Sequence, residues 1–123
     1  HGWELADPIA ATRSTQAYQA YMASSLGEIC LAKHGYVAAR SGWFSERTCL
    51  YLASGRPVVA QETGWTDWLP AGEGALAFST LNEAVAAIEE VGTDSARHAA
   101  AARRLAIEHF RAEDVCAEIL AAL

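Results

Sequence analysis

Residues 40–64, RSGWFSERTCLYLASGRPVVAQETG, carry the strongest fold signal in the chain. The first half of this stretch predicts a helix over residues 45–54, with Ser45 as the N-cap and Gly55 as the left-handed residue after its end. The second half contains residues 57–61 (PVVAQ), a short and almost wholly apolar run. Such a run is typical of a parallel strand that is covered on both faces. A helix that leads directly into a buried strand predicts an α/β fold.

Strands and helices alternate on both sides of this stretch. Before it, we expect a helix over residues 9–26 and a β-prone run over residues 28–33 (EICLAK). Residues 36–39 either extend that run or form a second segment. After it, a loop rich in Gly, Thr and Trp leads to a short strand at residues 75–78.

The remaining residues are expected to be helical. Thr80 and Glu83 predict a capping box, and the helix that they start ends at Gly92. A second helix, capped by residue 93 or 94, runs to about residue 110, and residues 112–123 form a last one. The buried stripe of the first of these helices is expected to be Leu81, Ala84, Val85, Ile88 and Val91. The pattern predicts a three-layer, Rossmann-like partial domain: a short parallel sheet of about three strands flanked by helices, with a helical C-terminus.

Composition indicates one small folded domain over residues 1–123. The chain is 52% hydrophobic and 20% charged, which suits a packed core and not a disordered chain. Its three cysteines, Cys30, Cys49 and Cys116, form no C-x-x-C pair and lie among apolar residues, so we expect free thiols and a cytoplasmic protein. No apolar run approaches the roughly 20 residues that a membrane span needs.

The charge distribution favours a small anionic ligand over a nucleic acid. A net charge of -6 should repel nucleic acids and anionic lipids. Between residues 29 and 61, however, four basic residues face a single acid, Glu46. This basic island fits a phosphorylated ligand, although chance clustering gives the same pattern. Its four members are Lys33, Arg40, Arg47 and Arg56.

Two loops carry the candidate site. The first enters the expected helix at Ser45, whose free backbone amides and helix dipole suit an anion, and Arg40 and Arg47 lie on either side of it. Gly42 allows the backbone to approach a ligand closely, although an ordinary helix cap gives the same residues. The second loop follows the strand at residues 57–61, at the sheet edge where open α/β folds bind ligands. It carries Thr63, Gly64 and Trp65, and Trp65 and Trp68 either stack on a ring or anchor the loop.

The histidines and acids provide weaker candidates for a functional site. His34, His98 and His109 have no zinc-ligand spacing, and no G-x-S-x-G, Walker or G-x-G-x-x-G pattern is present, so we expect neither a metal nor a bound cofactor. Glu46 is a weak candidate for a catalytic acid or base, because its neighbour Arg47 would pair with it or leave it solvated.

The runs AKHGYVAARSGWFSERTCLYLASGRPVVAQETGW and LPAGEGALAFSTLNEAVAAI resemble the donor-binding, C-terminal part of bacterial GT-B fold glycosyltransferases of the "glycosyl transferases group 1" type. The resemblance covers residues 18–123 and is carried by a Ser-x-Arg helix start, an L-A-x-G-x-P-V-V turn and a T-G loop. It implies a fragment that binds a nucleotide-sugar, while a separate N-terminal domain, missing here, binds the acceptor. The fragment alone would be inactive.

The resemblance assigns positions to the ligand. By position, Ser41, Gly42, Ser45 and Arg47 would lie at the diphosphate or sugar, with Lys33 and Arg40 as second-tier candidates. Thr63, Gly64 and Trp65 would close the donor pocket from the next loop.

Two departures from the family pattern keep alternatives open. The paired glutamates of many retaining members fall at Gly42 and Leu50 here, so the sequence decides neither retention nor inversion. The short sheet suggests the distal part of a larger domain, whose bare edge invites a homodimer in isolation. The alternative to a donor domain is a non-catalytic α/β module that serves in assembly or regulation.

Overall fold

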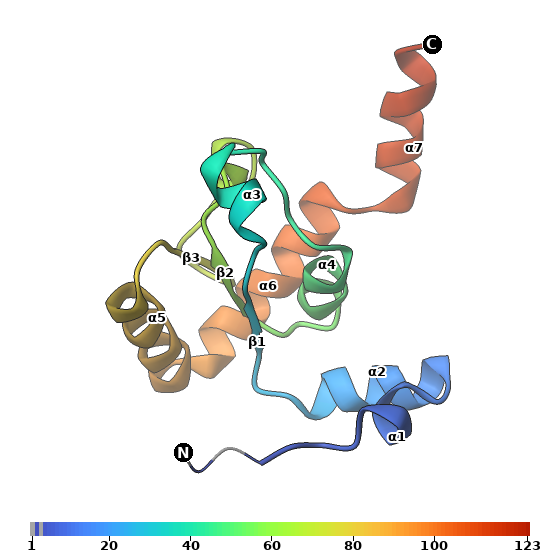
Figure 1. Cartoon of the computed structure of the whole chain (residues 1–123). Coiled ribbons are helices and arrows are strands. Elements are labelled where there is room, and N and C mark those ends of the chain that lie inside the picture. The colour runs from blue at the N-terminus through green and yellow to red at the C-terminus, as the bar shows by residue number, and fades with distance from the viewer. Residues whose placement is uncertain (1, 3) are drawn as a thin grey trace.

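The computed structural model describes residue 2 and residues 4–123. The helices are α1 (Pro8–Thr12), α2 (Thr15–Ser24), α3 (His34–Ala38), α4 (Glu46–Ala53), α5 (Leu81–Thr93), α6 (Ser95–His109) and α7 (Ala112–Ala121), with a 3-10 turn, η1, at Trp65–Asp67. The strands are β1 (Glu28–Cys30), β2 (Val58–Gln61) and β3 (Ala75–Phe78). The predicted α/β class, with a short parallel sheet and a helical C-terminus, is confirmed (Figure 1).

The sheet has the order β1-β2-β3, and both pairs of strands are parallel. In its register Ile29 lies opposite Val59, and Val59 lies opposite Leu76. These three side chains therefore share one face of the sheet, because side chains alternate along a strand. The residues on either side of them, Val58 and Ala60 among them, face the opposite way.

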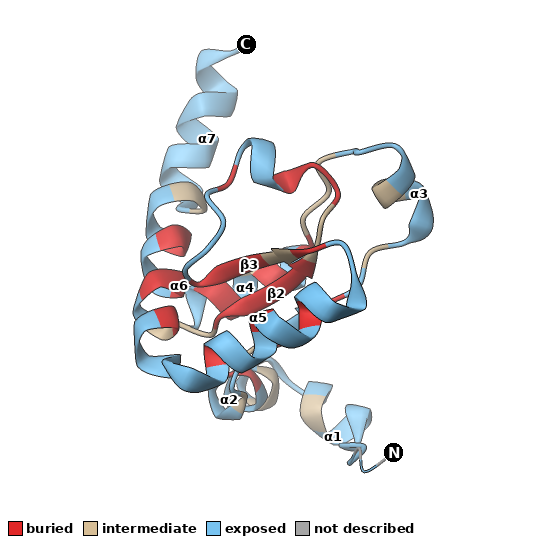
Figure 2. Cartoon of the chain, turned by 90° about the vertical axis from the view of Figure 1, so that its left-hand side faces the viewer, coloured by how far each residue is buried: buried red, intermediate tan, exposed pale blue. Residues whose placement is uncertain are grey.

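Helices cover both faces of the sheet (Figure 2). α4 and α6 pack against each other and against one face, and α5 packs across the other. The core is accordingly divided into two clusters of buried residues. The α4/α6 face buries Met22, Cys30, Tyr51, Leu52, Val58, Ala60, Trp65, Leu69, Ala75, Ala102, Leu105 and Ala106. The α5 face buries Val59, Leu76, Phe78, Ala84, Ala87 and Val91.

The turns that place the helices follow the sequence signals. Ser45 caps α4 by accepting a hydrogen bond from the Arg47 N–H, and Gly55 adopts a left-handed φ of 66° after the helix ends. Thr80 and Glu83 form the predicted capping box. Asp94 caps α6 by accepting from the Arg97 N–H at 3.2 Å. These predictions are confirmed.

Three local predictions need correction. Residues 36–39 were expected to be extended, but they belong mainly to α3, whose Tyr36 ring stacks on Trp43 with centroids 5.0 Å apart. The helix expected over residues 9–26 is two helices, because Ser14 adopts an extended backbone and caps α2. The strand expected over residues 28–33 is only three residues long.

The apolar stripe of α5 is also not buried as expected. Ala84 and Val91 are buried, whereas Leu81, Val85 and Ile88 are 79%, 45% and 39% exposed. The reason is the width of the sheet: three strands do not reach under the whole apolar side of α5. Part of that side is left without a neighbour.

The two terminal segments of the described chain lie at opposite ends of the molecule, and α2 reaches the core through Met22. α7 projects from the body beyond the end of α6 and buries none of its residues (Figure 1). α1 and α2 lie at the opposite end, next to the start of β1. No helix in the described part of the chain is long and apolar enough to cross a membrane.

Candidate functional site

The two loops that the sequence singles out meet at the carboxyl edge of the sheet. The Gly42 N–H donates to the Thr63 carbonyl at 2.8 Å, and the Thr63 hydroxyl donates to the Trp43 carbonyl at 2.6 Å. The Trp68 indole N–H donates to the Gly42 carbonyl at 3.1 Å. These bonds join the loop before α4 to the loop after β2. We call residues 40–45 together with residues 62–68 the carboxyl-edge loops.

Two glycines allow this close approach. Gly64 has a φ of 94°, and a Cβ atom built there would lie 3.0 Å from the Arg40 carbonyl oxygen. Gly42 has a φ of 72°, and a Cβ atom there would lie 3.4 Å from the Trp68 indole nitrogen. Residues that carry a Cβ atom rarely adopt a positive φ. Both positions therefore favour glycine, because of the backbone conformation and because of the limited space.

Arg40 is the basic side chain at this crossing. It has a positive φ of 45°, and its guanidinium contacts Asp67 at 3.2 Å and Glu62 at 3.9 Å. Its side chain is 59% exposed, so the guanidinium remains open to solvent and to a ligand. Lys33 and Ser41 are also exposed near the carboxyl edge.

The side chains of Ser45 and Arg47 already interact with other groups of the chain. Ser45 is buried, and its hydroxyl accepts the Arg47 N–H at 3.3 Å. The Arg47 side chain turns away from the carboxyl-edge loops and pairs with Glu28 through its Nε atom. The hydrogen bond to Glu28 raises the pKa of Arg47. The structure therefore does not bring Arg47 together with Gly42 and Gly64.

Thr63 and Trp65 support the second loop from within. Both are 0% exposed, and the Trp65 indole N–H donates to the Gln61 carbonyl at 3.2 Å. The Phe44 ring packs against Trp65 with centroids 5.2 Å apart. Trp65 is thus the anchor of the loop and not a surface for stacking a ligand. Of Trp65 and Trp68, only Trp68 is open to a ligand, because it is half exposed.

Glu46, the weak catalytic candidate, is the first residue of α4 and is exposed. It forms no ion pair within the described residues. An acid in the first turn of a helix stabilises the helix dipole, which explains the residue without catalysis.

Glu28 is the residue that sequence reasoning missed. Its side chain is only 5% exposed, and it is the partner of Arg47. A charged residue at the start of an otherwise apolar strand is the signal that was available, because buried acids almost always need a partner.

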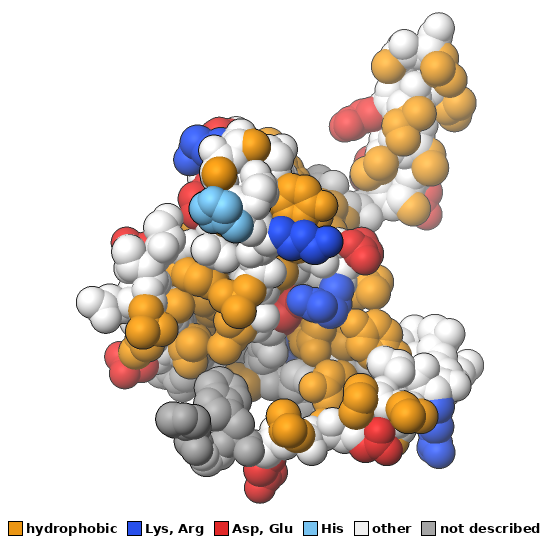
Figure 3. Space-filling model, viewed as in Figure 1, with side chains coloured by type: hydrophobic (Ala, Val, Ile, Leu, Met, Phe, Trp, Pro, Cys, Tyr) orange, Lys and Arg blue, Asp and Glu red, His pale blue; other side chains and the backbone are white. Residues whose placement is uncertain are grey.

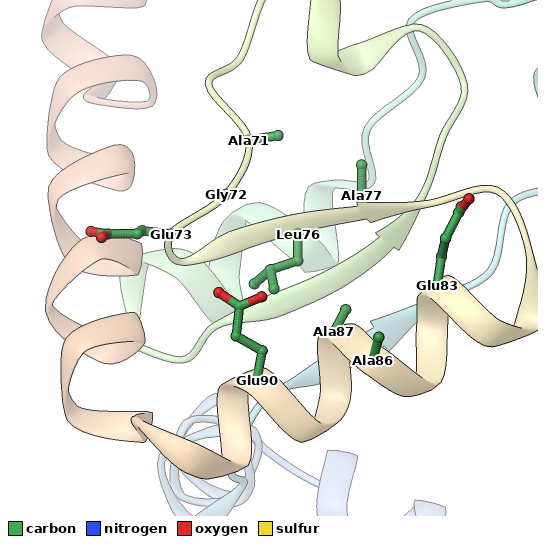
Figure 4. A pocket seen from close by; sticks show the side chains of 9 residues that line it. All are labelled: Ala71, Gly72, Glu73, Leu76, Ala77, Glu83, Ala86, Ala87 and Glu90. Atoms are coloured by element: carbon green, nitrogen blue, oxygen red, sulfur yellow. The ribbon is translucent and has the colours of Figure 1, made fainter.

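A separate hollow lies between β3 and α5, with a volume of about 590 Å³ (Figure 4). Three glutamates line it, but each already has a partner. Glu83 accepts two backbone N–H groups in the capping box, Glu73 pairs with Arg97 and Arg104, and Glu90 lies 3.5 Å from Arg97. The hollow therefore offers no free charge to a ligand.

Comparison with known proteins adds no assignment: no family model, curated protein or solved structure matches this chain. Within the described residues, no group of three or more His, Cys, Asp or Glu side chains is arranged to hold a metal ion.

Proposed function

We propose that this chain is the nucleotide-sugar (donor) binding part of a glycosyltransferase that transfers a sugar to an acceptor. The acceptor would be bound by a separate N-terminal domain, so the enzyme would be active only as a full-length protein. The proposal requires neither a metal nor a bound cofactor.

The observation that carries the proposal is the meeting of the carboxyl-edge loops beside the start of α4. Ligands of open α/β folds bind outside the carboxyl ends of the strands. Here that edge holds the amino end of an eight-residue helix and the guanidinium of Arg40, which is 59% exposed while it contacts Asp67 and Glu62. A guanidinium and a helix start both stabilise a phosphate group.

In this arrangement the residues divide into two roles. Lys33, Arg40 and Ser41 would contact the diphosphate, because they are exposed. Thr63, Gly64 and Trp65 would shape the wall behind the ligand, because Thr63 and Trp65 are buried and Gly64 sits against Arg40. Transfer would then be favoured by positioning the donor and by stabilising the negative charge of the departing nucleotide diphosphate.

A second candidate is a non-catalytic assembly or regulatory module. It is favoured by the way the site residues satisfy one another: Ser45 is used as a cap, Thr63 bonds to Trp43, and Arg47 pairs with Glu28. Side chains that are already paired have less to offer a ligand.

Nucleotide binding distinguishes these two functions. Isothermal titration of the chain with UDP, GDP, dTDP and ADP should show binding of one nucleotide. Arg40→Ala and Gly64→Trp should each weaken it at least tenfold, whereas Arg104→Ala, which removes an exposed arginine paired with Glu73, should leave it unchanged. Arg47→Ala tests whether Arg47 leaves Glu28 to contact the ligand. Weaker nucleotide binding by this variant would show that it does, and unchanged binding would show that it does not.

Circular dichroism of each variant shows that loss of binding is not loss of fold. If none of the four nucleotides binds to a folded sample, the result would favour the assembly module. Equal losses in Arg40→Ala and Arg104→Ala would show that the attraction is general and not a site.

A further inference from the structure

The backbone of Arg40 has an unusual conformation. Among the described residues other than glycine, it is the one with a positive φ, 45°. For a residue with a Cβ atom this conformation costs free energy, and such residues cluster at ligand sites. The Arg40 N–H donates to the Val37 carbonyl at 3.1 Å, and Gly64 lies against the Arg40 carbonyl. The backbone therefore fixes the point at which the Arg40 side chain leaves the loop.

The guanidinium of Arg40 is already bound to a carboxylate. Its Nη2 atom donates to both oxygens of Asp67, at 3.4 and 3.2 Å. Its Nη1 atom lies 3.9 Å from Oε1 of Glu62. Figure 3 shows basic side chains with acidic ones beside them at the end of the molecule that holds α3. Because two acids contact one base, Arg40 and its partners together carry a net negative charge.

Asp67 is held near Arg40 by the turn that carries it. It is the last residue of η1, and its N–H donates to the Gly64 carbonyl at 3.2 Å. The buried ring of Trp65 anchors the same turn from within. The Asp67 side chain is 72% exposed, and within residues 4–123 Arg40 is the one group that its carboxylate pairs with. The pair with Arg40 is therefore not needed to fix the turn.

The Asp67 carboxylate stands where an anionic ligand of Arg40 would bind. Carboxylates and phosphates accept hydrogen bonds from a guanidinium in the same way. A phosphate that binds Nη2 must displace Asp67. A phosphate that binds elsewhere on the guanidinium lies close to the carboxylates of Asp67 and Glu62, whose negative charge repels it. In either position the carboxylate opposes the ligand.

We propose that Asp67 is an internal competitor for the anion site of Arg40. A bound diphosphate displaces the Asp67 carboxylate, and the free energy needed to break the pair lowers the affinity of the site. The inference rests on the proposed function, because that function places the diphosphate at Arg40. Ion pairs as exposed as this one are weak, so a ligand with several negative charges can replace the carboxylate.

The other role for Asp67 is to orient Arg40 toward the ligand. The structure favours competition, because the contacts of the Arg40 backbone with Val37 and Gly64 already fix its position. The two roles also predict opposite results. Removal of a competitor tightens ligand binding, whereas removal of an orienting residue weakens it.

Isothermal titration of the whole chain with inorganic pyrophosphate, UDP, GDP, dTDP and ADP tests the competition. Asp67→Asn keeps the size of the side chain and removes its charge. It should tighten the binding of pyrophosphate, and of the nucleotide that binds, about threefold to fivefold. A fivefold change corresponds to about 1 kcal/mol, the upper range for an exposed pair. Circular dichroism of the variant checks that the fold is kept.

Glu46→Gln is the matched control. Glu46 begins α4 beside the carboxyl-edge loops, is exposed and forms no ion pair within the described residues, so this variant removes the same charge without releasing an arginine. It should tighten binding less than Asp67→Asn does. In ¹³C NMR of the natural chain, the side-chain carboxyl carbon of Asp67 should shift as pyrophosphate binds, because its carboxylate leaves Arg40.

The outcomes separate this inference from the proposed function. If a nucleotide binds the natural chain and Asp67→Asn leaves its affinity unchanged or weaker, the competition is wrong and the proposed function stands. If no nucleotide binds but Asp67→Asn tightens pyrophosphate binding, the competition stands and the proposed function is wrong. Equal tightening by Glu46→Gln, or an Asp67 carboxyl signal that does not move, would overturn the competition. The absence of binding by every probe to both chains would overturn both.

Discussion

The carboxyl-edge loops and the free edge of β1 belong to the same short sheet. They differ in whether their backbone N–H and C=O groups find hydrogen-bond partners within the chain. In the carboxyl-edge loops, Gly42 donates to Thr63, and Trp68 donates to Gly42. At the edge of β1, the strand pairs with β2 on one side only. Each region also holds one buried glutamate oxygen without a hydrogen-bond partner among the described residues, Oε2 of Glu62 in the loops and Oε2 of Glu28 beside β1. The first region is fixed by its own contacts and presents a preformed surface. The second region leaves one side of a strand without a neighbouring strand in the described sheet.

If the carboxyl-edge loops are fixed from within, their anchor should be the most sensitive position. Trp65→Ala should lower the free energy of unfolding by about 3–5 kcal/mol, because it removes a fully buried aromatic side chain. Ile29→Ala, at the open edge, should cost about 1 kcal/mol or less, because Ile29 is already 45% exposed. Urea unfolding monitored by circular dichroism measures both. Similar losses for the two variants would remove the contrast.

The ion pairs of the two regions should also differ. Arg47→Met leaves the carboxylate of Glu28 buried without its cation and should cost about 2 kcal/mol; this is below the 3–5 kcal/mol of a fully buried pair, because Arg47 is half exposed. Arg40→Met removes an exposed pair with Asp67 and a longer contact, 3.9 Å, with the mostly buried Glu62, and it should cost about 1 kcal/mol or less. Urea unfolding of both variants provides the comparison. A larger loss for Arg40→Met would show that the two pairs have been ranked in the wrong order.

The crossing of the loops depends on Gly64. Gly64→Ala should cost about 1–2 kcal/mol, because the residue has a φ of 94° and the new Cβ meets the Arg40 carbonyl. Gly92→Ala is the matched control: Gly92 lies within α5 with open space around it, so this variant should gain about 0.5–1 kcal/mol. Thermal unfolding of both variants tests the pair, and a neutral Gly64→Ala would mean that the loops can separate.

The smallest effect concerns Tyr51, which is buried on the α4/α6 face of the sheet. Burial raises the pKa of the Tyr51 phenol above its ordinary value of 10.0. The unfolded chain therefore loses this proton first, so the stabilisation from neutral Tyr51 is complete below pH 10 and is lost as the pH rises above it. Urea unfolding between pH 9 and pH 11 should show a shallower decline for Tyr51→Phe than for the natural chain. Parallel declines would place the Tyr51 hydroxyl in solvent.

Local signals in the sequence predicted the elements whose ends are chemically marked. Ser45, Gly55 and Thr80 set helix ends through side-chain caps or a left-handed turn, which depend on neighbours in the sequence. α3 escaped prediction because Gly35 and Val37 are poor helix formers, and its Tyr36 is held by stacking on Trp43. The exposure of Ile88 escaped it too, because periodicity shows which side of a helix is apolar and not whether a strand lies beneath it.

The sequence predicted where the candidate site lies but not how all of its side chains pair. The sequence predicted that Arg40, Gly42 and Gly64 lie at one edge of the sheet. In the structure the loops that carry them contact each other through their backbones. It did not reveal that Arg47 pairs with Glu28, since these residues are 19 positions apart and meet only after α4 packs beside β1. Long-range pairing of this kind is fixed by the fold and leaves no periodic pattern.

The central claim is that the carboxyl-edge loops bind a nucleotide, and the most direct measurement is an NMR titration of the whole chain with UDP, GDP, dTDP and ADP. The account predicts that one nucleotide shifts the backbone amides of residues 40–48 and 63–68, while the amide of Ile29 stays unchanged. Unchanged amides in both loops with all four nucleotides, or shifts spread evenly over the surface, would contradict it.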